Sequence, residues 1–344
     1  MGKRRILNLL VALTISGGAL FFAIRHVSLQ QLGEVLRNGH YGCLLPAPLV
    51  LLLIFGLRAL FWRQTLSVTR EVSFFSLYSA VIIGYMANNI LPLRAGEMIR
   101  ALYARKLENL PLPLLISTIF IERLFDMVSL SLLLFLFFTT ASHPIEQKSL
   151  WVIGGTFGLF AGLYALVYWR EKVLQLLIWS ILPLAKKHRL AAQLLHLAEQ
   201  TLHGLSSLTA PIQLLRLFLT SLSIWFLNLI FTWLCLITFD ITESPLEMTL
   251  AFLIFTNLAL LIPSSPGGLG VFQLAAIYAL APYHVSENRA LVLSLVDQAL
   301  VIAVTSIFGY FFISRSHMSL SSMQHQAVQI SEGGTLSEQE KGVL

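Results

Sequence analysis

Three charged residues lie close together inside the otherwise apolar segment 111–139. They are Glu122, Arg123 and Asp126. A charged side chain that faces lipid at the centre of a membrane helix costs about 2.5–3.5 kcal/mol on insertion scales, so all three are expected to face the interior of a helix bundle. On a helix, Glu122 and Asp126 share one face, and Arg123 lies one turn from Asp126. A polar cavity that binds a charged headgroup or relays protons fits this pattern, and so does a structural ion-pair cluster.

A second charged group follows a predicted helix break at Pro92 and Gly96. It consists of Arg94, Glu97 and Arg100, with Glu97 and Arg100 one turn apart on the short helix expected after the break. The guanidinium fork matches the geometry of phosphate oxygens, which makes Arg94 and Arg100 candidates for gripping a phosphate. The alternative is that they anchor the chain at the cytoplasmic membrane surface.

Glycines gather at a third position, in the run Pro266-Gly267-Gly268-Leu269-Gly270. No Gly-Lys-Ser/Thr follows, so this is not a nucleotide-binding Walker loop. A glycine-rich turn that opens a short helix can receive an anion at the free amides of the helix start. A tight turn that needs glycine for its backbone conformation explains the run equally well.

The composition defines the class of protein that must position these residues. Hydrophobic residues make up 56% of the 344 residues and charged residues 12%, whereas soluble domains carry about 25% charged residues. An all-α polytopic membrane protein is therefore predicted. The net charge of +6 comes from residues that flank apolar segments, which indicates membrane surfaces rather than nucleic acid. Cys43 and Cys235 show no metal-ligand spacing, and no disulfide, metal or cofactor is expected.

Two apolar stretches are predicted to be re-entrant hairpins of opposite orientation, and about six others to span the membrane. The predicted spans are 6–24, 42–62, 111–139, 150–169, 212–239 and 289–313. The hairpins are 73–106 and 248–282. This arrangement places most Lys and Arg residues, and both termini, on the cytoplasmic side, whereas full crossing by every segment reverses that distribution. Arg58, in the second span, is expected to snorkel toward the cytoplasmic interface.

The two hairpins resemble each other. Leu91-Pro92 with Gly96 is similar to Ile262-Pro263 with Gly267, and a spanning helix follows each unit. An inverted repeat with broken helices is typical of transporters, whose ligand site lies near the interface between the repeats. Chance similarity is the alternative, because the match is weak letter by letter.

The predicted domain organisation has two parts, a transmembrane domain and a tail. The transmembrane domain is expected over 1–313. It includes an amphipathic cytoplasmic or interfacial segment at 171–209, where basic residues precede a stripe of leucines. Residues 314–344 are rich in Ser, Gln and Glu and are expected to form a disordered cytoplasmic tail.

Three motifs together resemble one known family across roughly residues 5–313. The motifs are Asn89-x-x-Pro92-x-Arg94-x-Gly96-Glu97-x-x-Arg100, Glu122-Arg123-x-x-Asp126 and Pro266-Gly267-Gly268-Leu269-Gly270. They are similar to the lysylphosphatidylglycerol synthase transmembrane-region family, also called flippase-like. The resemblance implies an integral protein of the inner membrane that moves lipids or lipid-linked headgroups between leaflets. The substrate-binding residues that it implies are Arg94, Glu97, Arg100, Glu122, Arg123, Asp126, Gly267, Gly268 and Gly270.

The sequence departs from that family at two positions. Gln273 stands where the family usually has Glu shortly after the glycine turn, and Asp297-Gln298 stand where the last span commonly has Arg. If those positions normally pair, both partners have changed together, which makes Gln273 and Asp297 candidates for altered substrate or energy coupling. The chain is also expected to lack the soluble aminoacyl-transferase half, so lipid lysinylation is not predicted.

Three functions are compatible with these features. The leading hypothesis is a lipid translocase that binds the anionic headgroup of a phospholipid or a polyprenyl-phosphate-linked lipid in a polar cavity between the hairpins. On this hypothesis the protein is not expected to be an enzyme. A membrane-embedded lipid-modifying enzyme would instead use Glu122 or Asp126 as a base. An accessory partner of an envelope-lipid glycosyltransferase is the third hypothesis. The sequence leaves the oligomeric state open, a homo-oligomer included.

Overall fold

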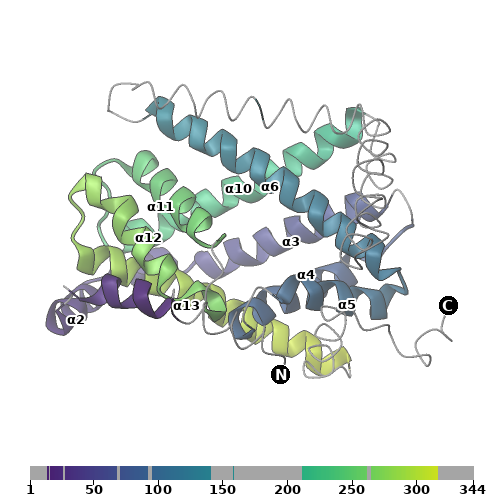
Figure 1. Cartoon of the computed structure of the whole chain (residues 1–344), viewed down its shortest axis with the longest axis horizontal. Helices are drawn as coiled ribbons and strands as arrows, with labels where there is room; N and C mark the ends of the chain where they lie inside the picture. Colours follow the sequence, from purple (N-terminus) through teal and green to yellow (C-terminus); the bar gives the residue numbers. More distant parts are fainter. Residues whose placement is uncertain are drawn as a thin grey trace, which may run out of the picture.

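The computed structural model describes residues 14, 16–25, 28–67, 70–91, 95–140, 158, 211–261 and 265–316. Every regular element in these ranges is a helix, which confirms the predicted all-α class (Figure 1). Three helical stretches are long and apolar enough to cross a membrane: Tyr41–Leu66, Pro211–Thr238 and Glu287–Ser316. They coincide with three of the predicted spans. The first contains the 3-10 turn η1 (Tyr41–Leu44) and helix α3 (Ala47–Leu66), and the other two are α10 and α13.

A fourth long helix, α6 (Leu112–Thr140), coincides with the predicted span that carries the charged residues. Residues 16–24, part of the first predicted span, are helical as well. The predicted span 150–169 (Gly158 apart) and the amphipathic segment 171–209 lie outside the described residues. So does the predicted tail from residue 317 on, while α13 continues to Ser316. The predicted count of spans, the domain boundaries and the tail therefore stay predictions.

The first predicted hairpin is a pair of packed helices, α4 (Phe74–Ile90) and α5 (Gly96–Glu108). Leu91 leaves α4 in an extended conformation (φ −97°, ψ 139°), as expected for a residue that precedes proline. The Gly96 N–H donates to Oδ1 of Asn88 at 2.9 Å, which ties the start of α5 to the end of α4.

The second predicted hairpin is also a pair of packed helices, α11 (Pro245–Ala259) and α12 (Val271–Leu280). The 3-10 turn η3 (Pro266–Gly268) lies between them, and η4 (Ala281–Tyr283) follows. In each pair the first helix ends before the predicted proline, and the second begins at or after the predicted glycines. Insertion of either pair into the membrane from one side stays a prediction.

The packing brings the two helix pairs together around the long helices. Helix α3 packs against α10 and α4, α4 also packs against α13, and α5 and α11 each contact α6. The turn η3 contacts α4, so the break of the second pair abuts the first pair. The short helix α2 (Leu29–Arg37) lies at one end of the long axis of the molecule and α5 at the other (Figure 1).

Candidate functional site

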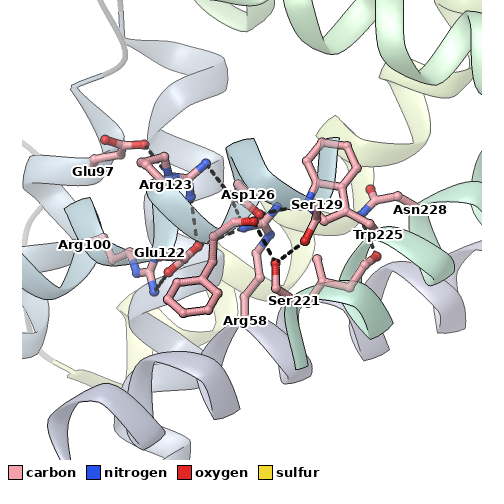
Figure 2. A network of polar contacts seen from close by, with 12 residues as sticks. Arg58, Glu97, Arg100, Glu122, Arg123, Asp126, Ser129, Ser221, Trp225 and Asn228 are labelled. Atoms are coloured by element: carbon pink, nitrogen blue, oxygen red, sulfur yellow. Dashed lines mark hydrogen bonds and ion pairs between the residues drawn. The ribbon is translucent and has the colours of Figure 1, made fainter. Parts of the chain in front are cut away.

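Glu122 is the centre of a cluster of charged side chains (Figure 2). The cluster, called the arginine cluster, consists of Arg58, Glu97, Arg100, Glu122, Arg123 and Asp126. Its Oε1 lies 2.8 Å from Nη1 of Arg58 and 2.8 Å from Nη2 of Arg123, and its Oε2 lies 2.8 Å from Nη2 of Arg100. Only 1% of Glu122 is exposed. Buried charges are tolerated when they are paired. Here one carboxylate of α6 faces guanidinium groups from α3, α5 and α6 itself.

Asp126 completes the acidic side of the arginine cluster one turn further along α6. Its Oδ2 lies 3.1 Å from Nη1 of Arg58 and 3.1 Å from Nη1 of Arg123, and its Oδ1 accepts a hydrogen bond of 3.0 Å from Nε1 of Trp225. Arg58 is buried and bridges both acids, so the prediction that it snorkels to the interface is wrong. The carboxylates of Glu122 and Asp126, one helical turn apart, offer that guanidinium two charged acceptors inside the protein.

Aromatic and hydroxyl groups surround the arginine cluster. The guanidinium carbon of Arg100 lies 4.0 Å from the centroid of the Trp62 ring, a cation–π contact, and Nε1 of Trp62 donates to the Thr118 hydroxyl at 2.8 Å. The Ser129 and Ser221 hydroxyls lie 2.8 Å apart and link α6 to α10. The Trp62 ring therefore covers Arg100, and the serine pair ties α6 to α10.

One side of the arginine cluster is open. The Arg123 side chain is 34% exposed and that of Glu97 is 43% exposed, and Nε of Arg123 lies 3.4 Å from Oε1 of Glu97. Arg100 is 3% exposed. Of the candidates expected to bind a headgroup, Arg123 and Glu97 are therefore the pair that a ligand can reach, while Arg94 lies outside the described residues.

The charges of the arginine cluster balance, but its donors are not all used. Three arginines face three acids. The Nε atoms of Arg58, Arg100 and Arg123 are buried and have no hydrogen-bond partner within the described ranges. Arg100 Nη2 also lacks a partner in hydrogen-bond geometry there, although it lies close to Glu122. An anion that displaces one of the carboxylates can therefore accept hydrogen bonds from these donors.

The glycine turn lies in a different part of the structure. Gly267, Gly268 and Gly270 have φ values of 69°, 73° and 90°, a region that favours glycine. The Gly268 N–H donates to the Ser265 carbonyl at 2.9 Å and the Gly270 N–H to Oε1 of Gln273 at 2.7 Å. Because these two amides are already bonded within the turn, the geometry favours the tight-turn interpretation over an anion site.

Gln273 joins the glycine turn to the last long helix. Its Nε2 donates to Oε1 of Gln298 at 2.8 Å, and Nε2 of Gln298 donates to the Gly267 carbonyl. Gln273 therefore pairs with Gln298 and not with Asp297. Asp297 is 7% exposed, and in the part of the chain that the structure describes it makes no hydrogen bond or ion pair.

Replacing Gln273 by alanine is expected to lower the free energy of unfolding by about 1–3 kcal/mol, because the Gly270 N–H and the Gln298 amide lose their buried partner. Thermal unfolding of the detergent-solubilised protein measures the loss. Gln213→Leu is the control, since Oε1 of Gln213 is buried without a hydrogen-bond partner among the described residues. Equal stability of both variants would contradict a structural role for the Gln273 network.

Sequence reasoning missed three members of the site: Arg58, Trp62 and Trp225. For Arg58 a signal existed, since a charge within an apolar span is expected to face protein, just as Glu122 is. Nothing in the sequence separated the two tryptophans from lipid-facing aromatics. Among the described residues, no group of three His, Cys, Asp or Glu side chains is placed to hold a metal ion.

Apolar helices of membrane length packed around a buried ionic cluster define a multi-pass helical membrane protein. The sequence matches the family described as Lysylphosphatidylglycerol synthase TM region over residues 9–309, and the chain belongs to this family.

Related proteins match the chain to different extents. Glycosyltransferase AglD of Haloferax volcanii is 23% identical over 95% of this chain and 57% of its own length. The UPF0104 membrane protein MJ1595 of Methanocaldococcus jannaschii is 28% identical over 40% of this chain and 41% of its own length. The UPF0104 membrane protein MJ1078 of the same organism is 24% identical over 67% of this chain and 94% of its own length. The chain thus spans about half the length of the first two relatives.

Proposed function

We propose that the protein translocates a lipid with an anionic headgroup across the inner, cytoplasmic membrane. The substrate class is a phospholipid or a polyprenyl-phosphate-linked lipid. The observation that carries the proposal is the half-open Arg123–Glu97 ion pair at the edge of a buried, charge-balanced cluster. A purely structural cluster would gain from full closure, whereas a headgroup site needs a reachable cation.

Binding follows from the unequal environments of the charges. Glu97 is the acid best able to leave, because it is the most exposed and holds Arg123 at 3.4 Å. A headgroup phosphate takes its place and gains the unused donor at Nε of Arg123. Glu122 and Asp126 keep the guanidinium oriented, and the acyl or prenyl chains stay in the bilayer.

The arrangement of helix pairs supports a transport role. Each pair, α4–α5 and α11–α12, is interrupted by proline and glycine and is followed by a long helix that carries at least one buried acid. The contact between η3 and α4 is where an inverted repeat would place its interface. We propose that both pairs are re-entrant, with the N- and C-termini in the cytoplasm, as the distribution of Lys and Arg favours.

A second candidate function is assistance to an enzyme that transfers sugars to a membrane lipid. It is favoured by the extent of the match to the relative named glycosyltransferase AglD, which covers nearly the whole of this chain. A lipid-modifying enzyme with Glu122 or Asp126 as its base has less support, because arginines engage both carboxylates.

Arg123→Ala is expected to reduce the retention of anionic lipid by roughly tenfold, since the reachable guanidinium is lost. Native mass spectrometry of the protein purified from its membrane measures the retained lipid. Arg63→Ala, at the exposed end of α3, is the matched control for the loss of one positive charge. Translocation of a fluorescent phospholipid in proteoliposomes is then measured for the same variants.

The outcomes separate the candidates. Discrete anionic lipid in the wild type and in Arg63→Ala, lost in Arg123→Ala together with translocation, supports the translocase. Only bulk lipid, equal in all three proteins, contradicts the headgroup site and favours the accessory role. Chemically altered lipid in the proteoliposomes would favour the enzyme. Arg123→Lys, which keeps the charge without the fork, is expected to recover part of the lipid retention.

A further inference from the structure

A cavity of about 410 Å³, open at the surface, lies where the three apolar helices of membrane length end together. The start of the Tyr41–Leu66 stretch, the end of α10 at Thr238 and the start of α13 at Glu287 meet at this place. Its volume is in the range of small-ligand sites. Seven polar side chains line it, and the charged ones are Glu34, Asp240 and Arg289.

Helix α2 forms one wall of the cavity. Leu32 and Val35 pack against the hydrophobic core, while Gln31 and Glu34 line the cavity. A short helix with one apolar and one polar face, lying across the ends of membrane-spanning helices, is typical of the interface between hydrocarbon and water. Lipid headgroups occupy that interface, so a cavity at the ends of the predicted spans would be within their reach.

The backbone of the cavity wall is held in place before any ligand arrives. The His40 N–H donates to the Thr238 carbonyl at 2.8 Å, and Asp240 adopts a left-handed conformation with φ 54°. A Cβ at Gly39 would lie 3.1 Å from the rings of Phe239 and Tyr41, so the two loops are in close contact. Aspartate is one of the few residues that accept this conformation. The turn therefore fixes Asp240 at the cavity.

The lining favours a ligand that both donates and accepts hydrogen bonds. Asn288 donates to Oε1 of Gln31, and Oδ1 of Asn288 is buried with no partner in the described ranges. Glu34 and Asp240 can only accept, and Arg289 can only donate. A simple anion would meet both carboxylates, and a simple ammonium group would meet the guanidinium. Hydroxyl groups can bond to all of these side chains.

We propose that this cavity binds the hydroxyl-rich headgroup of a membrane lipid, at a site separate from the arginine cluster. Arg58 lies about three turns inside α3 from Ala47, which places the cluster about 16 Å deeper along the helix axis. The role of the cavity in transport rests on the proposed translocation of lipid. In that role, the cavity receives the headgroup at one membrane surface, before or after its passage through the cluster.

Nanodiscs that contain equal amounts of phosphatidylinositol, phosphatidylethanolamine and phosphatidic acid with the same acyl chains test the proposal. The retained lipids are identified by native mass spectrometry. Wild type is expected to retain two lipid molecules per protein. One of them is expected to be phosphatidylinositol, with a roughly tenfold preference over phosphatidylethanolamine and phosphatidic acid. The double variant Glu34→Ala/Asn288→Ala is expected to lose this preference and to keep one phosphate-bearing lipid. Arg37→Ala, on an exposed position of the same helix, is expected to behave as wild type.

Arg123→Ala separates this inference from the proposed function. If the cavity site exists, Arg123→Ala still retains phosphatidylinositol with its preference, even when the lipid at the cluster is lost. Equal retention of all three lipids by the wild type, or a preference for phosphatidylethanolamine, would overturn the hydroxyl-rich assignment. A preference that survives in Glu34→Ala/Asn288→Ala would overturn the location.

Discussion

Replacing Glu122 by alanine is expected to lower the free energy of unfolding by about 3–5 kcal/mol, the range for removing one partner of a buried ion pair. The loss is large because Glu122 contacts three arginines at 2.8 Å each. Arg58 and Arg123 keep Asp126 as a partner, but Arg100 has no other ion-pair partner among the described residues. Arg100 would then be a buried cation against the Trp62 ring alone.

Thermal unfolding in detergent measures this effect, and Glu97→Ala is the matched control. Glu97 is 43% exposed and its ion pair with Arg123 is 3.4 Å long, so its removal is expected to cost less than about 1 kcal/mol. The double variant Glu122→Gln/Arg100→Gln is expected to recover part of the loss, because it removes the unpaired cation together with its acid. If Glu122→Ala unfolds at the temperature of Glu97→Ala, the charges are not buried together as described.

Gly96→Ala is expected to disrupt the contact between α4 and α5 at a cost of about 3 kcal/mol or more. A Cβ at this position would lie 2.1 Å from the Gly84 carbonyl oxygen and 2.5 Å from Oδ1 of Asn88. The backbone of the two helices must separate to admit it. The shift reaches the site, since Gly84 would itself meet Cβ of Arg100 at 2.8 Å if it carried a side chain.

Gly56→Ala is the control for this prediction, because a Cβ there would lie 3.8 Å from the Tyr78 ring, an ordinary contact. Gly56 is inside α3, so alanine is expected to be neutral or stabilising by up to about 1 kcal/mol through helix propensity. Thermal unfolding and the retention of anionic lipid are compared for the two variants. Equal behaviour of Gly96→Ala and Gly56→Ala would mean that α4 and α5 do not approach each other this closely.

Local patterns in the sequence predicted the helices and the inward face of α6. The apolar spans required helices, because only hydrogen bonds within the segment can satisfy its backbone in lipid. Pro92 and the glycines at 267 and 270 predicted where the chain leaves its helices, because these residues restrict or free the backbone locally. The insertion cost of Glu122 and Asp126 predicted their burial, and both are buried.

The partners of those buried charges were decided by the tertiary structure alone. Arg58 reaches Glu122 across 64 residues of sequence and Trp225 reaches Asp126 across 99, and no periodicity within one segment records such a contact. The same holds for Gln273, whose partner proved to be Gln298 rather than Asp297. The cost of exposing a charge to lipid can be assessed from the sequence of one helix, and it predicts that the charge is buried. Which group neutralises it depends on how separate helices pack, and only the assembled bundle fixes that.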